Sequence, residues 1–334
     1  MRTALVGAPG KPFELVEDGP AEAGLGQVLV KVDACGICHT DAMFTAGLFP
    51  GARFPMVAGH EVAGTIQQLG SDVDGWRTGD RVGVGFCAGS CGRCSPCRAG
   101  DFVFCTSRAI TGITHRGGFA EGLVVPAGAL SAIPDEISAP DAAPLMCAGV
   151  TTFNALRHSD ASGGDLIAVL GLGGLGHLAV QFAAKMGFDT VAVSRGTDKQ
   201  ELAHHLGARH FVDSRTTDVA GALRDLGGAR VILSTITHAP AVSAAVGGLA
   251  PRGELIVAGA CADAIGVDTG VLIDQGRRIS GCLVGTPKDI EDTLAFCALT
   301  GIRPMVETVP LQDIERAFSR MLDGSARFRM VVLP

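Results

Sequence analysis

Apolar and polar residues alternate along the first third of the chain. QVLVKVDA (27–34) places apolar side chains at every second position, and HEVAGTIQQLG (60–70) and GDRVGVGF (79–86) are similar runs bounded by Gly and Asp. A period of two is typical of half-buried β-strands, and Gly and Asp are typical of the bends between them. The pattern therefore predicts a β-rich region before residue 150.

The middle of the chain alternates strands with helices. The apolar run DLIAVLG precedes the turn GLGGLG and the helical HLAVQFAAKMG, and TVAVS, DKQELAHHLGA and HFVD repeat strand, helix and strand. The short apolar runs RVILST, GELIVAG and RRISGCLVG follow. Strands alternating with helices predict parallel βαβ units. The tail from 289 to 334 mixes both kinds of segment, so we expect an α/β chain with boundaries near 150 and 286.

Composition and charge exclude several functional classes. The 334 residues are enough for two domains, and 47% of them are hydrophobic, enough for a large core. The formal net charge of −7 argues against a surface for nucleic acid or an anionic membrane. The N-terminus lacks the apolar segment of a secretory signal, and glycines interrupt the apolar stretch 166–187, so a membrane span is not expected. We expect a cytoplasmic protein with reduced thiols and a small-molecule partner.

Five of the eleven cysteines lie in CAGSCGRCSPCRAGDFVFC (87–105). Cys91, Cys94, Cys97 and Cys105 have the spacing C-x2-C-x2-C-x7-C. Four thiolates satisfy a tetrahedral zinc ion, whereas a bacterial ferredoxin run would end in a three-residue gap and a proline. The spacing predicts a structural zinc lobe at 87–105, with Cys87 outside the ligand set. A loop of unligated thiols is the alternative.

A second constellation is dispersed over CGICHTD (35–41), GHE (59–61) and LMCAGVTTF (145–153). Each piece is weak alone, because a lone cysteine such as Cys147 is usually a small buried side chain. Together they supply cysteine, histidine and cysteine, which are three ligands that leave zinc one open position. That composition is typical of a catalytic zinc site.

GLGGLG (171–176) fits the pattern G-x-G-x-x-G between a predicted strand and a predicted helix. This context predicts a dinucleotide site, in which Gly171 permits the tight turn, Gly173 lets the backbone approach a pyrophosphate and Gly176 allows close packing of the helix. Amides exposed at the helix start favour the anion.

The end of the next strand, VAVSRG (191–196), carries Ser194 and Arg195 where a carboxylate usually binds the ribose of NAD(H). An arginine there can bind a 2′-phosphate, which favours NADP(H) over NAD(H). Asp198 leaves NAD(H) possible if it reaches back to the ribose, although its place at the start of a helix is explained by capping alone.

With these motifs in this order, the chain resembles the zinc-dependent alcohol dehydrogenases of the medium-chain dehydrogenase/reductase family. The resemblance runs essentially end to end and rests on CGICHTD, AGHEVAG, the four-cysteine lobe, GLGGLG and the closing RFRMVV. It implies a GroES-like catalytic domain (1–149 and 286–334) interrupted by a Rossmann domain (150–285). It also implies two zinc ions per chain, a homotetramer or dimer, and hydride transfer between a zinc-bound primary aliphatic or aryl alcohol, or the matching aldehyde, and a nicotinamide cofactor.

The resemblance also assigns roles by position. Cys38, His60 and Cys147, but not Cys35, would bind the catalytic zinc, with Glu61 as a movable carboxylate. Thr40 would accept the alcohol's proton, and Asp41 would orient the histidine ligand. The cofactor would be contacted by His39 at its phosphates, Thr151 and Leu175 beside the nicotinamide, the loop glycines Gly171, Gly173, Gly174 and Gly176, Lys199 near the adenosine ribose, and Arg329 at the pyrophosphate.

The substrate pocket and the proton exit are less defined. By family position Phe49, Phe86 and Phe119 wall an apolar pocket, although each is equally suited to an ordinary core. The family often places a proton-carrying histidine three residues after the hydroxyl of Thr40, and here that residue is Met43, which cannot carry a proton.

Three other functions fit parts of the sequence. A non-catalytic redox sensor stabilised by zinc would keep GLGGLG and the four-cysteine lobe and would hold one metal ion per chain instead of two. A polyol or secondary-alcohol dehydrogenase of the same family typically lacks one cysteine ligand, and all three ligands are present here. A nucleic-acid-binding zinc ribbon lacks its basic footprint in this acidic chain.

Overall fold

The computed structural model describes residues 1–19 and 21–334, which divide into two compact units. Unit 1 comprises Met1–Val150 and Val284–Pro334, and unit 2 comprises Thr151–Leu283. Each unit has its own hydrophobic core and is described by itself.

Unit 1 is built on a seven-stranded sheet with the order β16-β17-β3-β4-β5-β9, in which β8 also pairs with β3. Only β16 and β17 pair in parallel. The strands are β3 (Gln27–Gly36), β4 (Glu61–Leu69), β5 (Arg81–Val84), β8 (Gly122–Pro126), β9 (Leu130–Ala132), β16 (Val306–Pro310) and β17 (Arg329–Leu333). Two small antiparallel pairs join β1 (Arg2–Val6) to β2 (Phe13–Glu17) and β6 (Cys87–Gly89) to β7 (Ala109–Ile110).

The helices of unit 1 are short apart from α10. They are α1 (His39–Thr45), α2 (Ser95–Arg98), α3 (Ala139–Pro144), α10 (Pro287–Thr300) and α11 (Ile314–Leu322). Helix α11 shows why the sequence folds this way, because its buried residues Ile314, Ala317, Phe318 and Met321 recur at helical spacing and join the core of the sheet.

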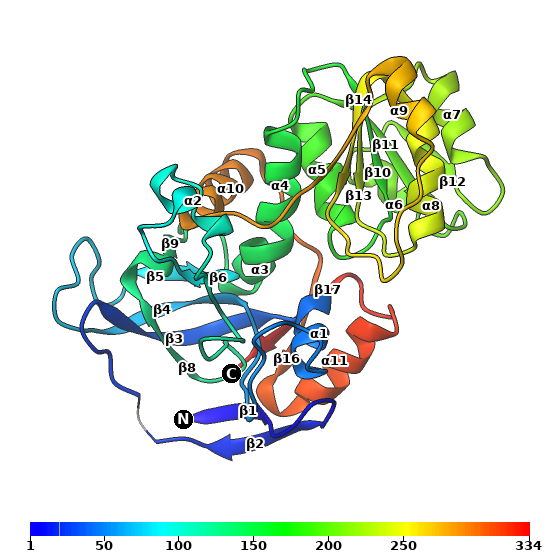
Figure 1. The fold of residues 1–334 in the computed structure, drawn as a ribbon. Coiled ribbons are helices and arrows are strands. Elements are labelled where there is room, and N and C mark those ends of the chain that lie inside the picture. Colours follow the sequence, from blue (N-terminus) through cyan, green and yellow to red (C-terminus); the bar gives the residue numbers. More distant parts are fainter. Residues whose placement is uncertain (20) are drawn as a thin grey trace. The chain divides into compact units, whose positions relative to one another are not determined.

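Unit 2 contains a six-stranded, fully parallel sheet with the order β12-β11-β10-β13-β14-β15. The strands are β10 (Leu166–Leu170), β11 (Asp189–Ser194), β12 (His210–Asp213), β13 (Ala229–Ser234), β14 (Leu249–Val257) and β15 (Arg278–Gly281). The helices are α4 (Val150–Arg157), α5 (Gly176–Lys185), α6 (Gln200–His205), α7 (Val219–Asp225), α8 (Ala239–Ala245) and α9 (Thr269–Gln275). Figure 1 shows α5 and α8 on opposite faces of this sheet.

The strand order reverses between β10 and β13, and parallel sheets of this kind bind ligands at the carboxyl ends of the strands on either side of such a point.

The predicted α/β fold with a β-rich part and a doubly wound parallel sheet is confirmed. The stretch 166–187 is β10, the glycine turn and α5, as the sequence indicates. In the described chain, no helix has both the length and the apolar character needed to cross a bilayer.

Candidate functional site

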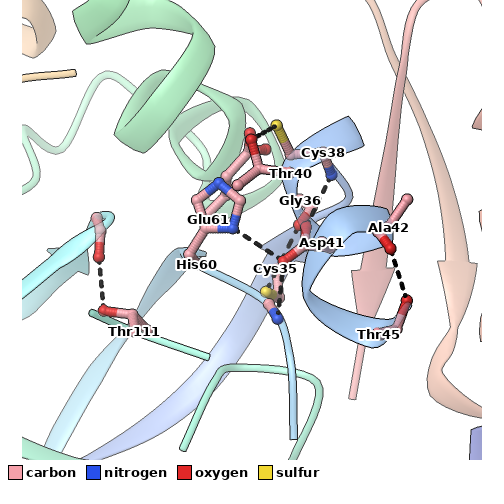
Figure 2. Close-up of polar contacts among 12 residues, drawn as sticks. Cys35, Gly36, Cys38, Thr40, Asp41, Ala42, Thr45, His60, Glu61 and Thr111 are labelled. Atoms are coloured by element: carbon pink, nitrogen blue, oxygen red, sulfur yellow. Dashed lines mark hydrogen bonds and ion pairs between the residues drawn. The ribbon is translucent and has the colours of Figure 1, made fainter. Parts of the chain in front are cut away.

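Asp41 is a fully buried carboxylate at which three segments of unit 1 meet. Its Oδ2 accepts a hydrogen bond from the backbone N–H of Cys38 at 2.9 Å, and its Oδ1 accepts one from the N–H of Gly59 at 3.1 Å. Oδ1 also lies 2.8 Å from Nδ1 of His60 (Figure 2). Cys38 precedes α1 and Asp41 is the third helical residue, so the carboxylate that caps the helix also orients the histidine.

The other nitrogen of the His60 ring, Nε2, is buried and has no hydrogen-bond partner among the described residues. It lies in a cluster with Cys38, Glu61 and Cys147, whose ligand atoms are all within 4.8 Å of one another and whose side chains are all buried. Cys147 comes from a π-helical turn, Leu145–Gly149, and such turns occur frequently at functional sites. A buried nitrogen without a partner is costly, and two thiols and an imidazole suit zinc, so the donor set fits a metal ion.

The shifted pKa values of His60 and Cys38 also indicate that their surroundings favour a positive charge near Nε2 of His60. Burial lowers the pKa of His60, but the charge of Asp41 and the hydrogen bond to it raise that pKa well above 6.5. The thiol of Cys147 and the ring of His60 lower the pKa of Cys38 well below 9.0 despite its burial. The surroundings that stabilise a proton on His60 and a thiolate on Cys38 stabilise a cation between them.

Glu61, a member of this cluster, forms a buried ion pair with Arg329. Nη2 of Arg329 donates to both carboxylate oxygens of Glu61, at 2.6 Å from Oε2. The pair has room because residue 36 is glycine, where a Cβ would lie 2.0 Å from the Glu61 carboxylate. Burial raises the pKa of Glu61 to about 7, although the charge of Arg329 opposes the shift. The structure therefore holds Arg329, assigned by resemblance to a pyrophosphate, against Glu61.

Three residues of α1 that the sequence singled out differ in whether they face the cluster or the solvent. Thr40 lies against the cluster, with Oγ1 3.6 Å from Sγ of Cys38 (Figure 2). His39, in contrast, is exposed at the start of the helix. Met43 is 39% exposed and so is open to water.

The rings of Phe86 and His60 are nearly perpendicular, with 5.8 Å between their centroids, and the ring centroids of Phe49 and Phe86 are 6.2 Å apart. Phe119 is fully buried in the core of unit 1 and contacts Phe13 at 5.9 Å. Phe86 thus adjoins the cluster, Phe49 packs against Phe86, and Phe119 belongs to the core.

The four cysteines of the 87–105 lobe form a second cluster, and their sulfur atoms lie within 4.8 Å of one another. Backbone amides point at the sulfurs, from Cys94 to Sγ of Cys91 at 3.4 Å and from Cys91 and Ser107 to Sγ of Cys105 at 3.3 and 3.4 Å. Hydrogen bonds from the backbone of Cys97 and Thr106 lower the pKa of Cys94 to about 6. Four converging sulfurs with amides that stabilise thiolates fit a closed tetrahedral metal site. Cys87 lies outside the set, in β6, and no cysteine of the described chain is in a disulfide.

The GLGGLG loop of unit 2 lies between β10 and α5, and its shape needs glycine at two positions. Gly171 has φ +93°, and a Cβ there would lie 2.5 Å from Cγ2 of Ile236. A Cβ on Gly176 would lie 1.8 Å from the carbonyl oxygen of Gly171, while the space beside Gly173 is open within 4 Å. The loop therefore turns tightly, packs α5 closely and leaves its middle accessible, as a pyrophosphate cradle requires.

Two side chains hold this loop in place by donating hydrogen bonds to its backbone carbonyl oxygens. The hydroxyl of Thr235, which follows β13, donates to the carbonyl oxygens of Leu170 at 2.8 Å and Gly171 at 3.2 Å. The ammonium group of Lys199 donates to the carbonyl of Leu172 at 3.0 Å. Lys199 therefore contacts the glycine loop itself.

The remaining predicted cofactor residues are at the carboxyl edge of the same sheet or near it. Ser194 is buried at the end of β11, and Arg195 is exposed in the loop that follows. Leu175 is half-buried immediately before α5, next to Gly174. Thr151 is buried, and its carbonyl accepts a hydrogen bond from the thiol of Cys282 at 3.4 Å.

Sequence reasoning missed two features of the cluster in unit 1. The first is the contact between Glu61 and Arg329, which are 268 positions apart and which no spacing rule connects. The second is Phe44, whose ring lies 5.6 Å from that of His60 and 5.0 Å from that of Phe49. Its place on α1, three and four residues after Asp41 and Thr40, was the available signal, because such residues share a helix face.

Comparisons with known proteins agree over nearly the whole chain. Residues 24–135 match the family described as "Alcohol dehydrogenase GroES-like domain", and residues 174–298 match "Zinc-binding dehydrogenase". Alcohol dehydrogenase patD of Penicillium expansum is 40% identical over 92% of this chain and 89% of its own. An alcohol dehydrogenase of Geobacillus stearothermophilus is 36% identical over 99% of each chain. The structure of CAD from Helicobacter pylori complexed with NADP(H) superposes with a TM-score of 0.88, covering 100% of this chain and 99% of that one at 27% identity.

Proposed function

The chain belongs to the zinc-type alcohol dehydrogenases of the medium-chain dehydrogenase/reductase family and is an oxidoreductase, and from this premise we propose that it interconverts primary alcohols and aldehydes with NADP(H). The observation that carries the proposal is the buried, unpartnered Nε2 of His60 among the thiols of Cys38 and Cys147. A non-catalytic nucleotide sensor would have no need for this donor set beside a hydroxyl such as that of Thr40.

We assign a catalytic zinc ion to Cys38, His60 and Cys147 and a structural zinc ion to Cys91, Cys94, Cys97 and Cys105. Zinc in the first set would act as a Lewis acid that lowers the pKa of an alcohol or polarises a carbonyl. Asp41 fixes the ring orientation and tautomer of His60. Glu61, paired with Arg329, places a further carboxylate beside the three ligands. The lobe keeps four converging thiols and no open position, which suits a structural role.

The chain's own groups then handle the proton. The hydroxyl of Thr40 stands beside Cys38 and can accept the proton of an alcohol that enters the open position. Met43 has no group that can pass the proton on, so a proton accepted by Thr40 would leave through water or through another residue. The GLGGLG loop of unit 2 would hold the pyrophosphate of a nicotinamide cofactor, which supplies the hydride chemistry when it is bound.

The cofactor assignment rests on the end of β11. Ser194 and Arg195 stand where a carboxylate would bind an unphosphorylated ribose, and an arginine matches the geometry of a phosphate. The CAD of Helicobacter pylori, which this chain resembles along its whole length, is complexed with NADP(H).

The substrate assignment rests on Phe86, whose ring stands next to His60, and on Phe49, whose ring packs against Phe86. Together they would wall an apolar pocket for a primary aliphatic or aryl alcohol. The resemblance supports two further proposals. The chain forms a homo-oligomer, either a tetramer or a dimer, and it works in the cytoplasm, where thiols stay reduced and able to bind metal.

The test is steady-state oxidation of primary aliphatic, primary aryl, secondary and polyol substrates with NAD and NADP in parallel, together with zinc analysis of the same sample. We expect turnover of primary alcohols, two zinc ions per chain, and kcat/KM at least about tenfold higher with NADP, because charge-assisted phosphate contacts are worth more than a kcal/mol. Turnover confined to polyols or secondary alcohols would contradict the substrate assignment, and one zinc ion with no turnover would favour the sensor.

Replacing Asp41 with asparagine should weaken zinc binding without unfolding unit 1. The substitution keeps the size of the side chain but removes the charge that orients His60, and such changes typically cost about 10–100-fold in metal affinity. A competition titration against a chelating dye measures the affinity, and circular dichroism measures the fold.

The matched control is Asp33→Asn, which removes a carboxylate of β3 that pairs with Lys31 of the same strand and Thr65 of β4 and lies outside the metal-ligating cluster. Asp33→Asn should bind zinc as the wild type does. Equal zinc affinity in Asp41→Asn and the wild type would show that Asp41 does not support a metal ligand.

A further inference from the structure

Two loops at the carboxyl edge of the unit 2 sheet are joined into one surface. Strands β11 and β12 pair with Ser194 opposite Asp213. Beyond that pair, the backbone N–H of Ser214 donates to the carbonyl of Ser194 at 2.9 Å, and its hydroxyl donates to the same oxygen at 3.2 Å. In return, the N–H of Gly196 donates to Oδ1 of Asp213 at 2.6 Å. The loop that carries Arg195 is therefore fixed to the loop that follows β12.

This connection brings Arg215 beside the Arg195 loop. The backbone N–H of Arg215 donates to Oδ1 of Asp213 at 2.9 Å, which fixes where its side chain starts. Its Nη1 lies 3.1 Å from the point where a Cβ on residue 196 would stand, and residue 196 is a glycine with φ +79°. Gly196 thus leaves room for the guanidinium of Arg215 against the backbone next to Arg195.

At this edge of the sheet, Asp213 and Lys199 have hydrogen-bond partners within the chain, whereas the two arginines have no ion-pair partner in the described part of it. Arg195 and Arg215 are both exposed, and neither guanidinium is in an ion pair within 4.0 Å among the described residues. The amides of Arg215 and Gly196 hydrogen-bond the carboxylate of Asp213 and lower its pKa, and the charge of the Arg215 side chain contributes to the shift without forming an ion pair. Asp198 also approaches, with Oδ1 3.3 Å from the same Cβ point on residue 196. Lys199 is committed to the carbonyl of Leu172, so two unpaired guanidinium groups remain to meet a ligand.

We propose that Arg215 binds the 2′-phosphate of NADP(H) together with Arg195 and is a second determinant of cofactor choice, an inference that rests on the proposed function. A phosphate monoester carries close to two negative charges and accepts paired N–H donors from a guanidinium in a fixed geometry. Two arginines on separate loops, held together by Asp213, can approach it from two directions. The 2′-hydroxyl of NAD(H) offers no charge to either arginine and leaves Asp198 as the group that favours it.

The test measures binding of adenosine 2′,5′-bisphosphate and of 5′-AMP to the zinc-loaded full chain by isothermal titration calorimetry, without substrate or turnover. The two probes differ only by the 2′-phosphate. We expect the wild type to bind the bisphosphate at least about tenfold more tightly than 5′-AMP, and Arg215→Ala to lose about 5–30-fold of affinity for the bisphosphate and none for 5′-AMP. Arg215→Lys should recover part of the loss, because it restores the charge without the paired geometry.

Arg209→Ala is the matched control. It removes an exposed arginine from the opposite end of β12, where Arg209 faces Asp189 at 3.8 Å, and so changes the net charge of unit 2 equally. It should bind both probes as the wild type does. Equal affinity of the wild type for the two probes, or an Arg215→Ala variant that binds the bisphosphate normally, would overturn the inference. Alcohol oxidation with NAD alone would leave the alcohol dehydrogenase activity standing while the NADP(H) assignment and this inference fail, and the bisphosphate preference without any alcohol oxidation would leave this inference standing while the proposed activity fails.

Discussion

Replacing Cys38 with serine should lower kcat/KM for alcohol oxidation by about three orders of magnitude or more and reduce the zinc content from two ions per chain to one. The hydroxyl of serine is a poor substitute for a thiolate as a zinc ligand. Loss of the Lewis acid removes several kcal/mol of transition-state stabilisation, and about 1.4 kcal/mol corresponds to tenfold in rate. Mass spectrometry under native conditions counts the bound ions, and steady-state kinetics measures the loss.

Cys35→Ser is the control that separates ligation from the general effect of a serine in this segment. Cys35 lies three residues earlier and is equally buried, but its thiol contacts the carbonyl of Gly36 at 3.7 Å and lies outside the metal-ligating cluster. Cys35→Ser should retain two zinc ions and most of the activity, with some loss of thermal stability from a buried hydroxyl. Normal turnover and two zinc ions in Cys38→Ser would refute the assignment of the catalytic site.

The architecture was accessible from the sequence because its signals are local. The run LIAVL is apolar at every position, and all five residues of β10 are buried, as in a strand covered on both faces of a parallel sheet. The helix after GLGGLG begins at Gly176, where a missing Cβ permits its close approach to Gly171. Turn residues, periodicity and burial therefore agree along the chain, and the confirmed fold class follows from them.

The three metal ligands could also be predicted from the sequence, but the residues that contact and position them could not. CGICHTD, GHE and the segment around Cys147 suggested three ligands, and the structure places the ligand atoms of Cys38, His60 and Cys147 within 4.8 Å of one another. The Glu61–Arg329 pair joins the start of β4 to the start of β17 and depends on how two distant strands pair with β3. Arg215 is likewise positioned by hydrogen bonds between loops. Long-range contacts of this kind leave no local pattern, so they appear only once the sheet register is known.

The four-cysteine lobe should control stability more than catalysis. Replacing Cys94 with serine removes one of four sulfur ligands and the thiol with the lowered pKa of about 6. A structural zinc site contributes to folding directly, because the ligands form no comparable site in the unfolded chain. We expect the variant to lose one zinc ion and its thermal midpoint to fall by about 10 °C, as several kcal/mol would produce in a chain of this size. Differential scanning calorimetry and zinc analysis measure both effects.

Limited proteolysis can show that the loss of stability in Cys94→Ser arises within the lobe. Arg93 and Arg98 are exposed trypsin sites between the cysteines, and a lobe held by metal should protect them. Cleavage at these arginines should therefore become fast in Cys94→Ser and remain slow in Cys87→Ser, which changes a half-buried cysteine of β6 outside the ligand set. Two zinc ions and slow cleavage in Cys94→Ser would mean that Cys94 is not a ligand of the structural zinc ion, and equal loss of zinc in Cys87→Ser would mean that the ligand set has been misidentified.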